Sequence, residues 1–188
     1  KIAWANEISS VVQTFNAYPR VVFFALHSDP RIGPQYMVPG WAASGPCLPR
    51  DLETWASWGK SGLASEALLS HKYRMAIVTQ RTLVSIQELK SPVVAVLGMT
   101  YNPNALDLTN SQGVMLVSAL EAANIPFNVY DPLSAQLKFS FPVCSSIEET
   151  IRNANVVVIT TPYLEFTSRD YGSRFVIDRT AGISSRVL

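Results

Sequence analysis

The stretch Val93-Val94-Ala95-Val96-Leu97-Gly98 decides the fold class of this chain. It is a continuous apolar run, rich in valine and closed by a glycine. Such runs are typical of strands that are buried on both faces of a parallel sheet. Three more strands are expected further along the chain, at residues 127–130, 156–160 and 175–177.

Helices are expected between these strands, at residues 111–123, with Ser111 or Asn110 as the N-cap, and at 147–153. Strands that alternate with helices predict an α/β fold, a Rossmann-like doubly wound parallel sheet with its ligand site at the carboxyl ends of the strands. The loop after the first strand, residues 98–103, contains a single glycine. It therefore does not match the G-x-G-x-x-G fingerprint of a dinucleotide site.

The residues before this sheet follow a helical pattern instead. Helices are expected at residues 1–16 and 65–88, with buried faces formed by Trp4, Ile8, Val11 and Phe15 and by Leu69, Tyr73, Ala76 and Leu83. Residues 21–27 would form a strand on their own pattern. Because the periodicity changes abruptly at 89–92, we predict an all-helical domain at 1–88 and the Rossmann-like domain at 91–188. Lys1 already lies within a helical pattern, so the chain is expected to be part of a longer protein.

The composition restricts the possible classes of function. Of the 188 residues, 48% are apolar, enough to form cores, and the formal net charge of +1 gives no basic field for nucleic acid. The longest apolar run, 21–26, is far shorter than the roughly 20 residues of a membrane span. Cys47 and Cys144 are the only cysteines, which excludes a disulfide framework and a zinc-ligand pattern. We expect a cytoplasmic protein that binds neither nucleic acid nor a membrane.

Chemistry is expected at Ser44-Gly45-Pro46-Cys47-Leu48-Pro49-Arg50-Asp51. Glycine and proline make a stiff turn before the cysteine, and Arg50 and Asp51 are predicted to begin a helix that runs through Trp58. A thiol just before a helix start lies at the positive end of the helix dipole and near a guanidinium, and both favour the thiolate. The alternative is that Cys47 is a small buried hydrophobic residue, as most free cysteines are. Cys144 is expected to be structural.

This stretch resembles the Gly-Gly-x-Cys-Phe/Leu-x-Lys-Asp signature of the nucleotide-sugar dehydrogenases, the UDP-glucose and GDP-mannose dehydrogenase family. Further motifs follow the family's order: Asn6-Glu7-Ile8, Asp29-Pro30-Arg31-Ile32-Gly33, Val96-Leu97-Gly98, Tyr130-Asp131-Pro132 and residues 156–161. The resemblance implies a helical dimerisation domain, with a short helix at 21–27, followed by a domain that binds the nucleotide of the sugar substrate. NAD would bind mainly to a separate N-terminal domain absent from this chain. The family's catalytic Lys and Asn would lie upstream of Asn6, so Lys1 is not the catalytic lysine.

The resemblance also implies an activity and individual roles. The activity is the NAD-dependent oxidation of a UDP-hexose of the UDP-glucose type to its uronic acid, for polysaccharide biosynthesis. Cys47 would be the nucleophile that forms a thiohemiacetal and a thioester, Asp51 would assist proton transfer or position water, and Arg50 would border the cofactor. The implied substrate-binding residues are Arg31, Tyr36, Gly45, Asn102 and Arg179. Arg31 would reach the nucleotide sugar of the second subunit of a homodimer, although on composition alone it is a solvated loop residue.

Three stretches depart from the family's motifs. The sequence at 40–45 is Gly-Trp-Ala-Ala-Ser-Gly where the family has Gly-x-Gly-Tyr-Gly-Gly, and Asn102 and Thr109 replace a lysine and an arginine. The family's Asp-Gly-Arg is Asp178-Arg179-Thr180 here, with the arginine shifted by one position. Each lost cation would have met a phosphate or a sugar hydroxyl. The alternative function is therefore a catalytically dead dimerisation and nucleotide-binding module of the same fold.

Overall fold

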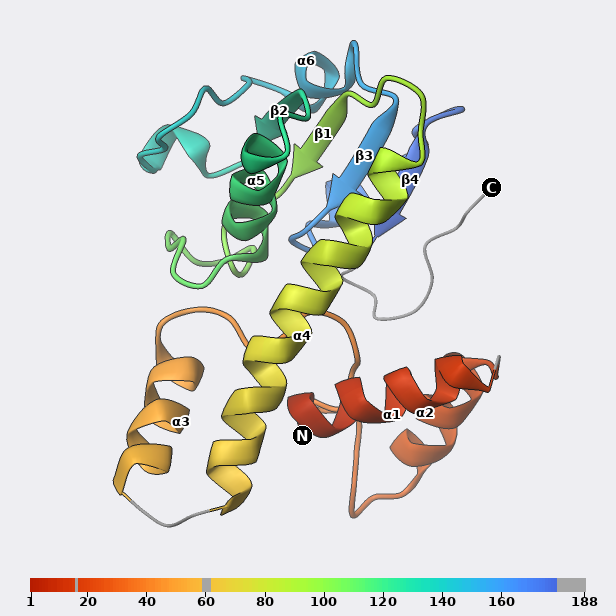
Figure 1. Cartoon of the computed structure of the whole chain (residues 1–188), viewed down its shortest axis with the longest axis vertical. Helices are drawn as coiled ribbons and strands as arrows, with labels where there is room; N and C mark the ends of the chain where they lie inside the picture. Colours follow the sequence, from red (N-terminus) through yellow and green to blue (C-terminus); the bar gives the residue numbers. More distant parts are fainter. Residues whose placement is uncertain (16, 59–61, 179–188) are drawn as a thin grey trace.

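The first half of the chain is helical. The computed structural model describes residues 1–15, 17–58 and 62–178 (Figure 1). Its first four helices are α1 (Ile2–Thr14), α2 (Pro19–Ser28), α3 (Cys47–Trp58) and α4 (Gly62–Gln87). Helix α4 packs along α3 and continues upward as the connection to the sheet (Figure 1). In the described part of the chain, no helix combines the length and the apolar character that crossing a bilayer requires.

The second half is a four-stranded parallel sheet with helices on both faces, so the predicted α/β class is confirmed. Its elements are β1 (Val94–Leu97), α5 (Gln112–Ala122), β2 (Phe127–Tyr130), η1 (Ser134–Gln136), α6 (Ile147–Ile151), β3 (Val156–Ile159), α7 (Leu164–Thr167) and β4 (Phe175–Asp178). The strand order is β2-β1-β3-β4, and every pairing is parallel. Ser111 is the N-cap of α5, and its hydroxyl accepts a bond from the Gly113 N–H.

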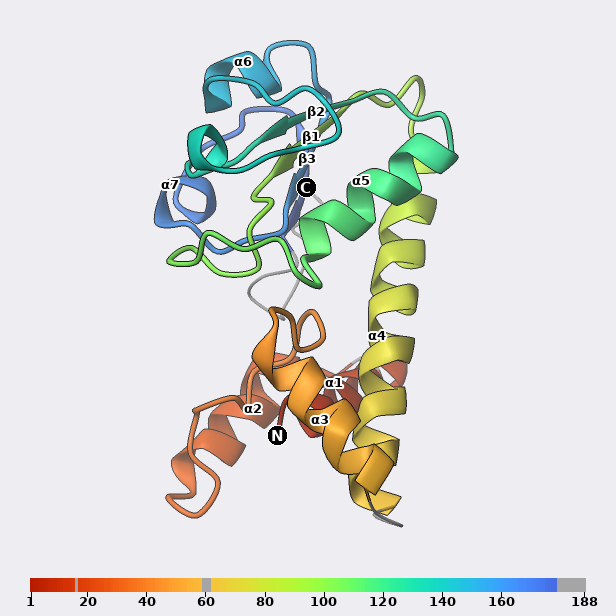
Figure 2. The same ribbon diagram turned by 90° about the vertical axis from the view of Figure 1, so that its left-hand side faces the viewer.

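The sheet core consists of two apolar layers. One face of β1 and β3 packs on α5 and the end of α4, through residues such as Leu116, Leu120 and Ile86. The other face packs on α6 and α7, through residues such as Ile147 and Phe166 (Figure 2). Because both faces are covered, all residues of β1 and β3 are buried, which explains their continuous apolar sequence. The carboxyl ends of these strands point toward the helical half (Figure 1).

Residues 21–27 belong to α2, which begins with Pro19 in its first turn and buries only Phe23 among its described residues. This is the helix that the resemblance implied, and not the strand that the local pattern favours. The predicted buried face of α1 is wrong, because Trp4 is 64% exposed and Phe15, which follows the helix, is 78% exposed. The buried positions of α1 are Ala5, Asn6, Ser9 and Val12, whose small or short side chains allow close packing against neighbouring segments.

The same reversal occurs on α4. Leu69 and Tyr73 are exposed, whereas Met75, Val78 and Ile86 are buried. Apolar spacing therefore located both helices but assigned the wrong face to the core of this chain. Helix α3 also begins earlier than predicted, at Cys47 instead of Arg50. Pro49 is tolerated there because backbone N–H groups in a first turn have no intrahelical partner.

Candidate functional site

Cys47 is the first residue of α3, and its side chain is exposed. The alternative of a buried hydrophobic cysteine is therefore wrong. Arg50, one turn along, donates from Nε and Nη2 to Oδ1 of Asp51 at 2.9 and 2.7 Å. This bond to Asp51 raises the pKa of Arg50, with a smaller contribution from Cys47. The thiol, the guanidinium and the carboxylate thus occupy one exposed helical turn.

The segment 40–46, here called the cysteine loop, is held by side chains of the helical half. The buried Asn6 accepts a bond from the Gly40 N–H at 2.9 Å and donates to the Trp41 carbonyl at 3.2 Å. Arg74 Nε donates to the Gly40 carbonyl at 2.7 Å. Sequence reasoning missed these contacts. The available signal was Asn6, an asparagine inside a helical pattern. Asparagine destabilises a helix interior unless its side-chain amide finds hydrogen-bond partners.

His71 holds the same loop from α4. Its Nδ1 accepts a bond from the Ala43 N–H at 3.3 Å. Burial lowers the pKa of His71, so the neutral ring that can accept this bond is favoured at neutral pH. Two helices therefore fix the loop that leads into Cys47.

The cysteine loop also contacts the sheet domain through Gly45. Gly45 has a φ of +79°, and a Cβ at this position would lie 2.6 Å from the ring of Tyr101. The Gly45 N–H donates to the Thr109 carbonyl at 3.0 Å, and Asn110 Nδ2 donates to the Gly45 carbonyl at 3.2 Å. Glycine is required here for its backbone conformation and for the close approach of the ring. The structure thus joins the predicted site residue Gly45 to the loop that follows β1.

The loop after β1 is itself fixed by Asp131, which follows β2. Asp131 is fully buried, and its Oδ2 accepts bonds from the N–H groups of Met99 and Thr100 at 2.6 and 2.9 Å. Its Oδ1 accepts from the Leu133 N–H at 2.8 Å and from the Tyr163 hydroxyl at 3.3 Å. Burial raises the pKa of Tyr163 to about 12, so this phenol stays a donor. Asp131 is therefore committed to holding the backbone of the sheet domain.

Arg31 lies in the exposed turn after α2. Its Nε donates to Oδ1 of Asp29 at 3.0 Å, and its Nη2 donates to Oδ2 at 2.6 Å. This pairing raises the pKa of Arg31 and lowers the pKa of Asp29. The Arg31 side chain remains 87% exposed. The outer Nη edge of the guanidinium therefore faces solvent, while Asp29 holds the Nε edge.

Two of the remaining predicted substrate residues lie apart from these contacts, and the third lies outside the described residues. Tyr36 is exposed, with a φ of +61°. Asn102 is exposed in the loop after β1, where its Oδ1 accepts the Asn104 N–H at 3.0 Å. Arg179 lies outside the described residues. Cys144 is half-buried, and its N–H donates to the Val129 carbonyl at 2.8 Å.

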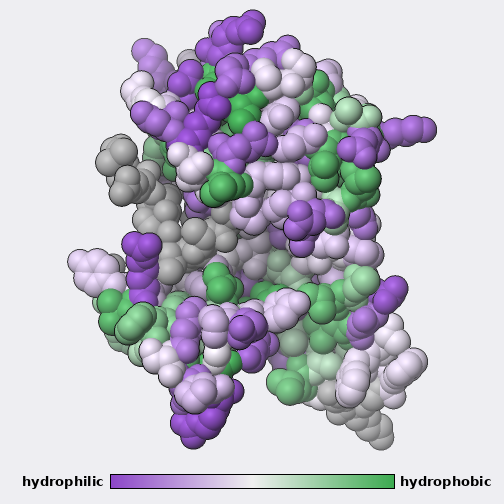
Figure 3. All heavy atoms as spheres, turned by 180° about the vertical axis from the view of Figure 1, so that it is seen from behind, coloured by the Kyte–Doolittle hydropathy of each residue, from purple (hydrophilic) through white to green (hydrophobic). Residues whose placement is uncertain are grey.

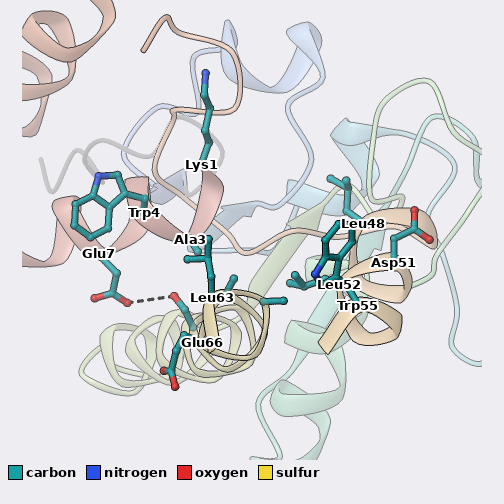
Figure 4. Close-up of a pocket in the computed structure, with 13 residues that line it drawn as sticks. Lys1, Ala3, Trp4, Glu7, Leu48, Asp51, Leu52, Trp55, Leu63 and Glu66 are labelled. Atoms are coloured by element: carbon teal, nitrogen blue, oxygen red, sulfur yellow. Dashed lines mark hydrogen bonds between the residues drawn. The ribbon is translucent and has the colours of Figure 1, made fainter. Parts of the chain in front are cut away.

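A groove of about 710 Å³ borders the first turns of α3 (Figure 4). It lies between α1, α3 and α4 and is lined largely by apolar side chains, including Trp4, Leu52, Trp55 and Leu63. Asp51 belongs to its lining, and the Glu7 carboxylate accepts a bond from Ser70 across it at 3.2 Å. Within residues 1–15, 17–58 and 62–178 there is no group of three His, Cys, Asp or Glu side chains suited to a metal ion.

Two family models match this chain in succession. Residues 1–73 match the central domain of the UDP-glucose/GDP-mannose dehydrogenase family, and residues 95–181 match its UDP-binding domain. The chain belongs to the UDP-glucose/GDP-mannose dehydrogenase family. Among curated relatives, the UDP-glucose 6-dehydrogenase YwqF of Bacillus subtilis is 23% identical over 175 residues, which are 88% of this chain and 40% of the relative. The UDP-N-acetyl-D-mannosamine dehydrogenase of Methanococcus vannielii is 26% identical over 89% of this chain and 39% of the relative.

Solved structures of this dehydrogenase family share the fold. A UDP-glucose dehydrogenase from Pyrobaculum islandicum superimposes with a TM-score of 0.82 at 25% identity, over 98% of this chain and 44% of that structure. The GDP-mannose dehydrogenase of Pseudomonas aeruginosa gives a TM-score of 0.65 at 18% identity, over 94% of this chain and 45% of that structure. The chain thus spans less than half the length of these dehydrogenases. It contains a central domain and a UDP-binding domain, and the cysteine loop is bonded to both.

Proposed function

We propose that residues 1–188 are the C-terminal part of an NAD-dependent nucleotide-sugar 6-dehydrogenase that oxidises a UDP-hexose of the UDP-glucose type. One observation carries the proposal. The exposed Cys47 thiol shares a helical turn with Asp51, and the loop before it is bonded to the strand-end loop of the domain that matches the UDP-binding model. The division into domains at 1–88 and 91–188, a cytoplasmic location and a role in polysaccharide biosynthesis belong to the same proposal.

In this proposal Cys47 performs covalent chemistry on an aldehyde. Its sulfur adds to the carbonyl carbon, and the thiol proton ends on the resulting hydroxyl, with Asp51 placed to assist the transfer. NAD, when bound, would supply the oxidising power: the alcohol becomes the aldehyde by losing a hydride and a proton, and the thiohemiacetal becomes the thioester by losing a second hydride and proton. Water then attacks the thioester carbon and releases the acid, which restores the thiol. Both bonds from Arg50 go to Oδ1 of Asp51, so Oδ2 is the oxygen placed to act on water.

The loop after β1 does not match the glycine fingerprint of a dinucleotide site. The loop after β1 has Gly98 as its single glycine, and the first turn of α5 contacts the cysteine loop through Gln112. We therefore propose that NAD is held mainly by a domain outside this chain, with Arg50 bordering it. Arg31, Tyr36, Gly45, Asn102 and Arg179 are proposed to bind the nucleotide sugar.

A catalytically dead module of the same fold is the second candidate. Two observations favour it. Arg50 and Asp51 neutralise each other beside the thiol, and Asn102 and Thr109 stand where the family has cations. A dead module would still bind UDP through the sheet domain, but it would not oxidise the sugar.

The proposal is tested in two steps. First, calorimetry should show that residues 1–188 bind UDP. Second, the chain should be joined to the N-terminal nicotinamide-binding domain of the Pyrobaculum islandicum relative. This relative is chosen because 44% of its structure superimposes on the present chain. Reduction of NAD with UDP-glucose, two equivalents per uronic acid formed, supports the enzyme. UDP binding without NAD reduction in a folded chimera favours the dead module, and a lack of UDP binding contradicts both.

We also propose that the helical half forms a homodimer. Large apolar side chains are exposed along its helices, namely Trp4 and Val11 of α1 with the adjoining Phe15, Val21 and Phe24 of α2, and Leu69 and Tyr73 of α4. Figure 3 shows hydrophobic atoms at several places over this half. Exposed apolar surface of this extent is typical of an interaction site. A dimer would also give Arg31 a neighbouring site to reach.

We expect light scattering at tens of micromolar to give the mass of a dimer. Phe24→Glu should shift the mass toward the monomer, because it buries a charge in the proposed interface. Leu164→Glu is the matched control, since Leu164 is equally exposed but lies on α7 of the sheet domain. A monomeric wild-type chain would contradict both the interface and the proposed role of Arg31.

A further inference from the structure

The amino end of α5 contacts the protein's own cysteine loop. In Rossmann-type domains this end of the helix commonly holds a pyrophosphate. Here Ser111 Oγ accepts the Gly113 N–H at 3.2 Å, and the side chain of Gln112 donates from Nε2 to the Ala42 carbonyl at 3.4 Å. Gln112 is only 5% exposed, so its amide is directed into the protein. The amino end of α5 is thus bonded to the segment that leads into Cys47.

Asn110 makes the second polar side-chain contact of this junction. Its Nδ2 donates to the Gly45 carbonyl at 3.2 Å, and the Gly45 N–H donates to the Thr109 carbonyl at 3.0 Å. Asn110 has a φ of +52°, a left-handed conformation that asparagine adopts more readily than most residues. The ring of Tyr101 covers the other side of Gly45. The end of loop 98–111 therefore bonds to Gly45, and the first turn of α5, which follows directly, bonds to Ala42.

We propose that Asn110 and Gln112 are positioning residues that couple nucleotide binding in the sheet domain to the cysteine loop and so to Cys47. The inference rests on the proposed function, in which the sheet domain binds UDP at its strand ends. The loop 98–111 begins at the carboxyl end of β1 and ends at the contacts with Gly45. Cys47 follows Gly45 by two residues. A ligand that orders loop 98–111 therefore also orders the turn that presents the thiol.

The test compares residues 1–188 with the double variant Asn110→Gly/Gln112→Ala. Glycine keeps the left-handed backbone of position 110 accessible, so the variant removes only side-chain contacts. In the wild-type chain, UDP should slow hydrogen exchange of the Gly45 amide and change the rate at which iodoacetamide modifies Cys47. In the double variant, exchange at Gly45 without UDP should be about tenfold faster. Added UDP should leave Gly45 exchange and Cys47 modification unchanged, although calorimetry still shows UDP binding.

Matched controls separate coupling from general damage. Asn104→Gly alters an exposed asparagine of the same loop, whose side chain has no described bond to the cysteine loop, and should behave as wild type. Modification of Cys144 should be unchanged in all variants. If the double variant does not fold, Asn110→Gly alone replaces it, because it removes the side-chain bond to the Gly45 carbonyl and leaves Gln112 in place.

The outcomes distinguish the inference from the function it rests on. A wild-type chain that does not bind UDP contradicts the proposed function, and the inference fails with it. A wild-type chain that binds UDP without any change at Gly45 or Cys47 overturns the inference alone. The same holds if the double variant keeps the UDP effect, or if neither variant folds, since the contacts are then purely structural.

Discussion

Replacing Cys47 with serine in residues 1–188 joined to a nicotinamide-binding domain is expected to reduce uronic acid formation by about a thousandfold or more. A hydroxyl has nearly the size of a thiol but is a far weaker nucleophile, so the covalent intermediate would not form. Binding of UDP-glucose should change little, because Cys47 is exposed and contributes no core packing. The measurement is NAD reduction together with detection of the acid product and calorimetry of substrate binding.

Cys144→Ser is the matched control and should leave activity unchanged. Cys144 is half-buried beside Phe141 and Val143, which pack against the sheet core. Because Cys47 is exposed and Cys144 is half-buried, iodoacetamide should modify Cys47 much faster than Cys144 across pH 6 to 9. Peptide mass mapping measures the two rates. Equal rates, or a fully active Cys47→Ser variant, would remove Cys47 from the mechanism and favour the dead module.

Asp131→Asn is expected to produce the largest loss of stability, about 3–5 kcal/mol in the free energy of unfolding. The Asp131 carboxylate is fully buried and accepts bonds from the N–H groups of Met99, Thr100 and Leu133. An amide cannot accept on both of its heavy atoms, so one set of these donors would lose its partner. The loop after β1 would then lose its anchor. Denaturant unfolding of residues 1–188 measures the change.

Asp170→Asn provides the comparison. Asp170 also accepts a backbone bond, from the Gly172 N–H at 2.9 Å, but it is exposed, so water can replace the contact. Its substitution should change the free energy of unfolding by about 0.5 kcal/mol or less. A similar small loss for Asp131→Asn would show that its bonds are dispensable for the sheet domain.

Much of the fold was predictable because a strand buried in a parallel sheet has a continuous apolar sequence. Strands β1 and β3 are apolar at every position since both of their faces are covered, and Ser111 caps α5 through a bond within its own turn. The motif around Cys47 likewise located the start of α3 within three residues. Such features depend on neighbours in the sequence, so the sequence alone determined them.

The buried faces of α1 and α4 were not predictable in the same way. Apolar residues mark every face that is shielded from water in the working protein, whether by this chain or by another one. In this chain α1 buries Ala5 and Ser9 and exposes Trp4 and Val11. The spacing of large apolar residues gives no means to separate an internal face from one that an additional domain or subunit would cover.

The arrangement around Cys47 was decided only by the tertiary structure. Asn6 and Trp41 are 35 residues apart, Gly45 and Asn110 are 65 apart, and Ala42 and Gln112 are 70 apart. A polar residue in a sequence shows that a partner is needed but not which segment supplies it, because hydrogen-bond partners are set by the packing of whole elements. By itself, the sequence determined the sheet, the helices and the position of Cys47 at a helix start. Tertiary packing determined which side chains hold the cysteine loop and that Asp131 anchors the loop after β1.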